Sequence, residues 1–498
     1  MGTPIKFVVR VYGTPATRSV KDVFMLTTDE WDDFGTKCYY HLSYIDPEGV
    51  RTEIGTIKIL QFANTKSRSR QTLARTVLPE TFSALDETFI SLGQEESFYE
   101  HIHKTLSKEQ RPAVLEALRD IAWQPDLAAP FEPTSAFRNS LMRFNDAQRA
   151  RRFGQALALG HTINEDFAFS YSAEIEGAVA SIETLIPFDP KDELPGRVVG
   201  IIGRNAVGKT QYLANLATDL CQIGRASGES QQKRDGRFDG QRPLFTRILA
   251  VSYSAFDRFV RPKSVAASYI YCGIRTEGGG LSRKGLIAKY RENQGRIRDA
   301  HRNSAWARYM TEVLGDSKEI LATSLEDEIN DPDVDDNALS LLSSGQSILV
   351  HFVTSLLAWL EPNSLVLFDE PETHLHPNAV ASLFNVLTAV LTEYESFAII
   401  ATHSPIVIQE IPAKRVIVFQ RDANLTVAEP ISLESFGESI AELTRHVFET
   451  NSVATLYRRT LTRLAQQEPI ERTVSRFDKE LSLSAQAFLI AQHEREDQ

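Results

Sequence analysis

Four short segments carry side chains that could bind and cleave a nucleoside triphosphate. The first, residues 203–210, reads Gly-Arg-Asn-Ala-Val-Gly-Lys-Thr. Its glycines allow sharp turns, and a helix after the run would direct a positive N-terminus at phosphate oxygens. Lys209 would contact the β and γ phosphates, and Thr210 would offer its hydroxyl to Mg²⁺. We therefore predict a phosphate-binding loop for ATP made by Gly203, Arg204, Asn205, Ala206, Val207, Gly208, Lys209 and Thr210.

Two acidic residues follow an apolar strand farther along the chain. The run 365–368, Leu-Val-Leu-Phe, is followed by Asp369 and Glu370. A carboxylate at the carboxyl end of a parallel strand lies where α/β folds bind their ligands. We expect Asp369 to contact Mg²⁺ and Glu370 to orient or deprotonate an attacking water. The alternative is that these residues only cap a helix after the strand.

A histidine follows a second apolar strand, Phe397–Ala401, in the run Thr402-His403-Ser404-Pro405. A lone histidine is more often structural than functional. At the edge of the same sheet, however, His403 could contact the γ-phosphate, and this position favours a catalytic role beside Glu370.

The fourth segment opens a predicted helix over 347–360. Its residues Ser343, Gly345 and Gln346 would present a helix N-terminus to an anion. One chain cannot easily bring this helix and its own phosphate loop to the same nucleotide. We therefore expect two chains, head to tail, each completing the ATP site of the other. The alternative is an ordinary N-cap.

Length and composition describe a folded protein of ordinary type. The 498 residues predict two to four domains, and 42% of them are hydrophobic. No run of 18 apolar residues occurs, and the first residues lack the apolar core of a signal peptide. Three widely spaced cysteines form no disulfide or metal pattern. These features predict a cytoplasmic protein without a membrane partner.

The pattern along the chain divides it into three parts. Residues 1–160 predict an added α+β domain, with early strands and a helical pattern from about 75 to 155. Residues 161–430 hold the four segments, interrupted by a Gly- and Ser-rich stretch at 225–243 that predicts a mobile insertion. Residues 431–498 predict a helical C-terminal segment.

Charge is uneven along the chain. The net charge is −12, which argues against a globally basic nucleic-acid coat. Residues 275–302 nevertheless hold eight basic and three acidic residues, and residues 326–336 hold seven acids. Either stretch can be a solvated face, and the basic one can also follow phosphates, so DNA or another nucleic acid remains an open partner.

Together the four segments resemble the ATPase cassette of the ABC family. The stretch 369–377, Asp-Glu-Pro-Glu-Thr-His-Leu-His-Pro, resembles the SMC, RecF and OLD branch rather than transporter cassettes. The resemblance covers about 161–430. It implies an α/β fold with an ABC ATPase (P-loop NTPase) core, the cofactors ATP and Mg²⁺, and contacts of Ser343 and Gly345 with the partner's γ-phosphate. It also implies that His374 and His376 lie in a loop at the dimer interface.

Three positions depart from the pattern of this branch. Ala206 replaces a common glycine of the loop, and Ser344 replaces the second glycine of the segment at 342–346. No glutamine follows the strand 248–253, where a Mg²⁺ contact is expected, so Ser254 is the candidate substitute. Slow, switch-like hydrolysis would fit these departures.

The resemblance leaves three functions open. OLD-like proteins carry a Toprim nuclease, but the residues after His403 lack its acidic pattern, so no intrinsic nuclease is expected. The chain is most similar to Septu-type ATPase subunits of bacterial antiphage systems, which implies a dimer or larger assembly and a separately encoded nuclease, such as an HNH protein. A RecF- or SMC-like repair ATPase is the alternative. A transporter cassette is the third and least favoured.

Overall fold

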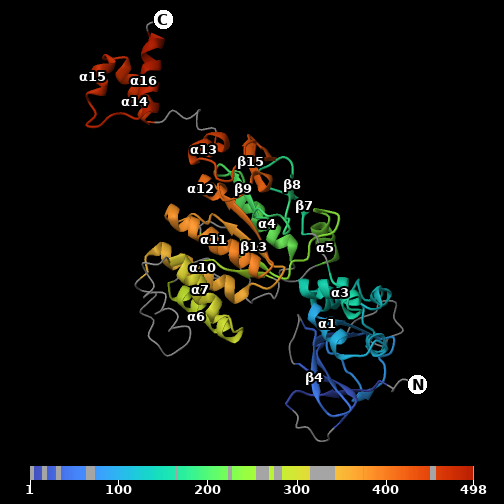
Figure 1. The fold of residues 1–498 in the computed structure, drawn as a ribbon. Helices are drawn as coiled ribbons and strands as arrows, with labels where there is room; N and C mark the ends of the chain where they lie inside the picture. The colour runs from blue at the N-terminus through green and yellow to red at the C-terminus, as the bar shows by residue number, and fades with distance from the viewer. Residues whose placement is uncertain are drawn as a thin grey trace. The chain divides into compact units, whose positions relative to one another are not determined.

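The computed structural model describes residues 5–13, 20–29, 35–62, 73–163, 167–221, 227–253, 259, 269–273, 283–314, 342–373, 375–448 and 456–496. By internal packing the chain divides into two compact units, 1–437 and 438–498 (Figure 1). Ser254, His374 and the acidic stretch 326–336 lie outside the described residues. The domain boundaries expected at 160 and 430 stay predictions.

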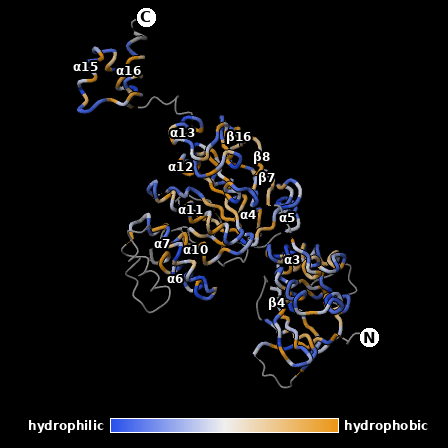
Figure 2. Tube along the Cα trace, viewed as in Figure 1, coloured by the Kyte–Doolittle hydropathy of each residue, from blue (hydrophilic) through white to orange (hydrophobic). Residues whose placement is uncertain are grey.

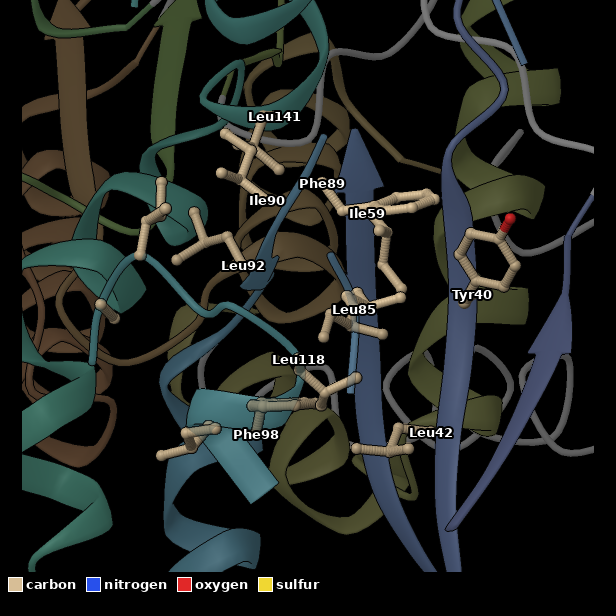
Figure 3. Packing of buried hydrophobic residues seen from close by; sticks show 14 of the residues in the cluster. Tyr40, Leu42, Ile59, Leu85, Phe89, Ile90, Leu92, Phe98, Leu118 and Leu141 are labelled. Atoms are coloured by element: carbon tan, nitrogen blue, oxygen red, sulfur yellow. The ribbon is translucent and has the colours of Figure 1, made fainter. Parts of the chain in front are cut away.

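A mixed six-stranded sheet forms the first part of the larger unit. Its order is β5-β1-β2-β3-β4-β6, with β1 and β2 parallel and the other neighbours antiparallel. The strands are β1 Phe7–Arg10, β2 Val23–Thr28, β3 Tyr39–Ile45, β4 Arg51–Gln61, β5 Thr81–Phe82 and β6 Phe89–Gly93. The sheet packs on α1 Glu96–Thr105, α2 Gln110–Ala117 and α3 Asn145–Ala158, with a short 3₁₀ turn at Pro125–Ala128 and a π turn at Phe137–Leu141. Figure 3 shows part of the core between them.

The expected helical pattern from about 75 is wrong up to residue 93. Residues 89–93 form the strand β6, which is buried along its whole length beside β4. Pairing with β4 satisfies its backbone groups, which a buried segment requires. Within this region the α-helices begin only at Glu96.

A seven-stranded sheet forms the second part of the larger unit. Its order is β12-β11-β13-β14-β9-β15-β16, and every pair is parallel except β15 with β16. The strands are β9 Val198–Gly203, β11 Ile248–Ser252, β12 Tyr269–Tyr271, β13 Leu365–Asp369, β14 Phe397–Thr402, β15 Val416–Asp422 and β16 Leu425–Pro430. Because β9, β13 and β14 are parallel neighbours, the residues that follow them meet at one edge of the sheet.

A small antiparallel sheet and a helix pack on one face of this large sheet. The small sheet has the order β10-β7-β8, from β7 Phe169–Ala173, β8 Ile182–Ile186 and β10 Phe238–Asp239. Helix α4, Lys209–Leu220, contacts both sheets. One hydrophobic cluster joins the three elements, and Tyr212 of α4 bonds Thr184 of β8 through its hydroxyl at 2.5 Å. The helix that follows the phosphate loop is thereby fixed at both faces.

The opposite face of the large sheet carries helices. Phe352 of α10, Ser344–Trp359, stacks on Phe368 of β13 at 4.7 Å between ring centroids. Helices α6 Arg283–Asp299 and α7 Asn303–Leu314 pack against α10, and α11 Pro377–Glu393 packs against α7. In Figure 2 the chain in the interior of this part is hydrophobic, whereas α6 is largely hydrophilic. Short turns complete the unit at α12 Pro405–Ile408 and η4 Ala413–Arg415.

The stretch 225–243, expected to be a mobile insertion, has regular structure in its described part. Residues 228–235 form helix α5, capped by a reciprocal pair of bonds between Ser227 and Ser230. Strand β10 then pairs with β7. Arg242 is buried and donates to the Leu220 carbonyl and to Gln148. The polar composition of this stretch suggested mobility, but Ser227, Ser230 and Arg242 form hydrogen bonds within the protein.

The C-terminal unit is helical, as expected. It contains α13 Ile440–Phe448, α14 Leu456–Ala465, α15 Ile470–Val474 and α16 Leu483–Glu496. Its small core includes Leu461, Ala465, Ala485 and Leu489. Within the described parts of the chain, no helix has the length and apolarity needed to cross a membrane.

Helix α3 ties the six-stranded sheet to the second part of the larger unit through Arg149. This side chain is 3% exposed, bonds both carboxylate oxygens of Glu96 at 2.9 and 3.1 Å, and donates to the Leu244 carbonyl at 2.7 Å. We expect Arg149→Met to lower the free energy of unfolding by about 1–3 kcal/mol, because removal of the arginine leaves the partly buried Glu96 carboxylate and the Leu244 carbonyl without this partner.

Urea denaturation of the Arg149→Met variant measures this effect. Arg151→Met is the matched control, since Arg151 pairs with Glu132 at the surface and such pairs contribute about 0–1 kcal/mol. Equal losses in the two variants would contradict the anchoring role of Arg149.

Candidate nucleotide-binding site

The predicted phosphate loop joins β9 to α4 as expected. Gly203 ends the strand, and a Cβ there would lie 2.3 Å from the Phe419 carbonyl oxygen, so only glycine fits. Gly208 has φ +102°, and a Cβ there would lie 2.6 Å from Ile175. Ala206 also lies in the left-handed region, at φ 66°. Glycine would adopt that conformation without strain, which explains why alanine is an unusual choice there.

Lys209 is held inside this loop. Its ammonium donates to the carbonyl oxygens of Gly203 at 2.8 Å and Arg204 at 3.0 Å, and the residue is 6% exposed. Burial lowers the pKa of Lys209, while the carboxylates of Glu370 and Asp369 act in the opposite direction. The loop therefore keeps a cation beside the strand ends that carry the acids.

The residues predicted to meet Mg²⁺ lie in contact. The Thr210 hydroxyl donates to Asp369 Oδ1 at 3.0 Å, although the two residues are far apart in sequence. Asp369 is 1% exposed at the end of β13. A hydroxyl and a carboxylate are hard oxygen donors of the kind that Mg²⁺ prefers, so this pair fits the ion. When bound, Mg²⁺ would neutralise charge on the β and γ phosphates.

Glu370 directly follows this strand in an uncommon conformation. Its φ is 50°, a left-handed value for a residue with a side chain, and its amide donates to the Ala401 carbonyl at 2.8 Å. Such strain persists only where surrounding structure imposes it. Here it turns the chain sharply after Asp369, so that two successive carboxylates have different surroundings: one buried, the other with a side chain 28% exposed.

His403 follows β14, at the sheet edge where the sequence predicted it, and lies beside Glu370. Its Nδ1 is 3.4 Å from Glu370 Oε1 and 3.3 Å from Glu372 Oε1. The Glu370 carboxylate, and to a smaller extent that of Glu372, raises the pKa of His403 above its ordinary value, and His403 in turn lowers the pKa of Glu370. Four predicted residues, Thr210, Asp369, Glu370 and His403, are thus gathered at one sheet edge beside Lys209.

The pH dependence of the free energy of unfolding should reveal the ion pairing of His403 in this cluster. Because the pKa of His403 is raised in the folded chain, its stabilising effect is complete below the ordinary histidine pKa of about 6.5 and is lost as pH rises through the folded value. We expect His403→Gln to destabilise the nucleotide-free protein more at about pH 6 than at about pH 9, measured by urea denaturation. A loss that is the same at both pH values would contradict the ion pair.

The residues predicted to contact the phosphate bound by a partner chain lie at the start of α10. This helix begins at Ser344, three residues before the predicted start, because Ser343 and Gln346 form a reciprocal capping pair. The side-chain Oε1 of Gln346 accepts from the backbone N–H of Ser343 at 3.0 Å, and the Ser343 hydroxyl accepts from the backbone N–H of Gln346 at 3.4 Å. Since Ser343 accepts in this pair, its own hydroxyl hydrogen can still be donated. Gly345 adds no side chain to this turn.

Two site residues had no role assigned from sequence. Glu372 contacts His403, and the signal was a third acid shortly after Asp369. Arg421 of β15 donates to the carbonyls of Gly177 at 2.8 Å and Ala206 at 3.5 Å, which connects the phosphate loop to the loop after β7. No local pattern marks Arg421, because its partners come from distant parts of the chain.

Comparison with known proteins agrees with this arrangement. The family model described as "AAA domain, putative AbiEii toxin, Type IV TA system" matches residues 308–409, which span α10, β13, β14 and His403. The chain is similar to protein ea59 of Escherichia phage lambda, with 27% identity over 467 residues that cover 86% of each chain.

Similar solved structures include an SMC head domain and an ATP-binding cassette. One is the SMC head domain from Thermotoga maritima, with 13% identity, a TM-score of 0.30, and coverage of 53% of this chain and 98% of that one. Another is MJ1267, an ATP-binding cassette of an ABC transporter, with 13% identity, a TM-score of 0.30, and coverage of 57% and 95%. The core is an α/β domain in which the glycine-rich loop joins β9 to α4 and Thr210 contacts Asp369, and part of this domain matches the AAA model.

Proposed function

We propose that this chain binds and slowly hydrolyses ATP, and that ATP joins two copies head to tail. The observation that carries the proposal is the cluster of Lys209, Thr210, Asp369, Glu370 and His403 at one sheet edge. Lys209 and the loop amides hold the phosphates, and Glu370 accepts a proton from the attacking water. His403 stabilises charge on the γ-phosphate.

The second copy supplies the start of α10 in this proposal. Ser343 and Gly345 of one chain meet the γ-phosphate bound by the other, and Gln346 keeps that turn in shape through its bond to Ser343. A helix N-terminus stabilises an anion by roughly 0.3–1 kcal/mol at an exposed site. The effect is larger where water is excluded, as it would be between the two chains. ATP binding and the association of two chains are thereby coupled.

The biological role we propose is control of a separate effector nuclease in bacterial antiphage defence. The matching family model is described as a putative toxin of a toxin–antitoxin system, and the relative comes from a bacteriophage. Both favour conflict between phage and host over transport. The closed ATP-bound pair would hold or position the effector, and slow hydrolysis would time its release.

A RecF- or SMC-like repair ATPase is the alternative, and the basic stretch is its main support. In the described part of that stretch several cations are already engaged. Lys289 donates to the Tyr271 carbonyl, Arg302 donates to the carbonyls of Leu357 and Leu360 at the end of α10, and the Arg296 guanidinium lies 3.6 Å from the centre of the Trp359 ring. These contacts leave fewer charges for DNA phosphates.

Purification of the Glu370→Gln chain from its host with ATP separates the two roles. Lys209→Ala, prepared in the same way, is the matched control. A nuclease that co-purifies in fixed ratio with Glu370→Gln, but not with Lys209→Ala, supports the defence role. Recovery of DNA without a protein partner, and binding that weakens steeply with salt, would favour the repair role instead.

A further inference from the structure

The loop after β13 carries a carboxylate beyond the two that the proposed reaction uses. Glu372 has a side chain only 11% exposed, and one of its oxygens, Oε1, makes three contacts with the end of β14. It accepts from the Thr402 hydroxyl at 2.6 Å and from the His403 amide at 3.1 Å, and it lies 3.3 Å from the His403 ring nitrogen Nδ1. Glu372 therefore holds both the backbone and the ring of this histidine.

Glu372 and Glu370 approach the same atom of His403. The distance from Nδ1 to Glu370 Oε1 is 3.4 Å, close to its distance from Glu372. Because Nδ1 carries a single hydrogen, it can give a full hydrogen bond to only one carboxylate at a time. Glu372 is fixed by its bonds to Thr402 and to the amide of His403, whereas Glu370 is the more exposed of the two acids.

This arrangement has a consequence for the other ring nitrogen of His403, Nε2. Among the residues that the structure describes, none engages Nε2 of His403. A carboxylate that holds one imidazole nitrogen fixes the ring orientation and the tautomer, and so decides what the second nitrogen can do. With Nδ1 held by Glu372, Nε2 is the atom left to meet the γ-phosphate, to which it donates when the ring is the protonated imidazolium.

We propose that Glu372 is the positioning residue of His403, and that it holds Nδ1 so that Nε2 serves the phosphate while Glu370 stays free for water. This inference rests on the proposed ATPase function. It gives the three acids after β13 separate tasks: Asp369 for the metal, Glu370 for the water, and Glu372 for the histidine. Different surroundings commonly divide neighbouring carboxylates in this way.

The kinetic test uses Glu372→Gln, which keeps the size of the side chain and removes its charge. We expect kcat for ATP to fall about 10- to 100-fold, the usual cost of losing such a partner, with KM changed less than about twofold. In a His403→Ala background the same substitution should change kcat less than about twofold, because the two residues act as a unit. Glu429→Gln, an exposed acid on β16, is the control.

A merely structural role for Glu372 gives a different pattern. If Glu372 only closes the loop onto Thr402, its replacement will lower kcat by the same factor with or without His403, and that result would overturn the proposal. Should Glu372→Gln fail to fold, Glu372→Asp retains the charge but withdraws it by one methylene, and the same comparison is made with it.

A measurement without nucleotide keeps this inference separate from the proposed function. In the nucleotide-free protein labelled with ¹⁵N-histidine, the Nδ1 resonance of His403, identified by its loss in His403→Ala, should shift in Glu372→Gln and not in Glu429→Gln. An unchanged resonance would refute the positioning role even if ATP is hydrolysed. If the wild-type chain hydrolyses no ATP, the proposed function fails, and the resonance still decides whether Glu372 holds His403.

Discussion

Replacement of Lys209 by alanine should abolish ATP binding. Its ammonium is the buried cation of the phosphate loop, bonded to the carbonyls of Gly203 and Arg204, and nothing in the variant would replace its charge beside the phosphates. We expect affinity for ATP to fall at least about 100-fold, which corresponds to about 2.7 kcal/mol. Isothermal titration calorimetry with ATP and Mg²⁺ measures this directly.

Lys191→Ala is the control for that measurement, since Lys191 is an exposed lysine outside the phosphate loop. It should bind ATP as the wild-type chain does. Circular dichroism should show that Lys209→Ala remains folded. A folded Lys209→Ala chain with wild-type affinity would mean that ATP, if bound, binds elsewhere.

Replacement of Glu370 by glutamine should separate binding from hydrolysis. The amide keeps the shape of the side chain but cannot take a proton from water, and loss of a general base typically lowers a rate 10²- to 10⁴-fold. We therefore expect the release of phosphate to fall at least about 100-fold, with affinity for ATP within about threefold of the wild-type value. The measurement is phosphate release under single-turnover conditions, paired with titration calorimetry.

Glu429→Gln should leave both quantities unchanged. If Glu370→Gln hydrolyses ATP at the wild-type rate, the assignment of the base is wrong, and Glu372 would become the next candidate because it too contacts His403. If the variant loses affinity instead of rate, Glu370 contributes to binding rather than to proton transfer.

Local patterns in the sequence predicted the core of the site well. The strands that precede Asp369 and His403 begin where expected, because a continuous apolar run with a polar end marks a buried parallel strand. The glycine-rich loop between β9 and α4 was equally clear. Contact between Thr210 and Asp369 then follows from parallel pairing, which brings the ends of neighbouring strands to one edge.

Other features depend on partners that no local pattern reveals. The stretch 225–243 was expected to be mobile because it is polar, yet Arg242 is buried against Leu220 and Gln148, which come from separate elements. The strand β6 was missed because its partner β4 lies in an earlier part of the chain. The role of Glu372 needed the distance to the His403 ring, which the spacing of acids alone does not give.

If ATP joins two copies of this chain, the mass of Glu370→Gln in solution should show it most directly. Light scattering after size exclusion should give the mass of one chain without nucleotide and of two chains with ATP and Mg²⁺. The Lys209→Ala/Glu370→Gln double variant should stay at one chain in both conditions. A Glu370→Gln chain that binds ATP at saturation yet keeps the mass of one chain would contradict the account.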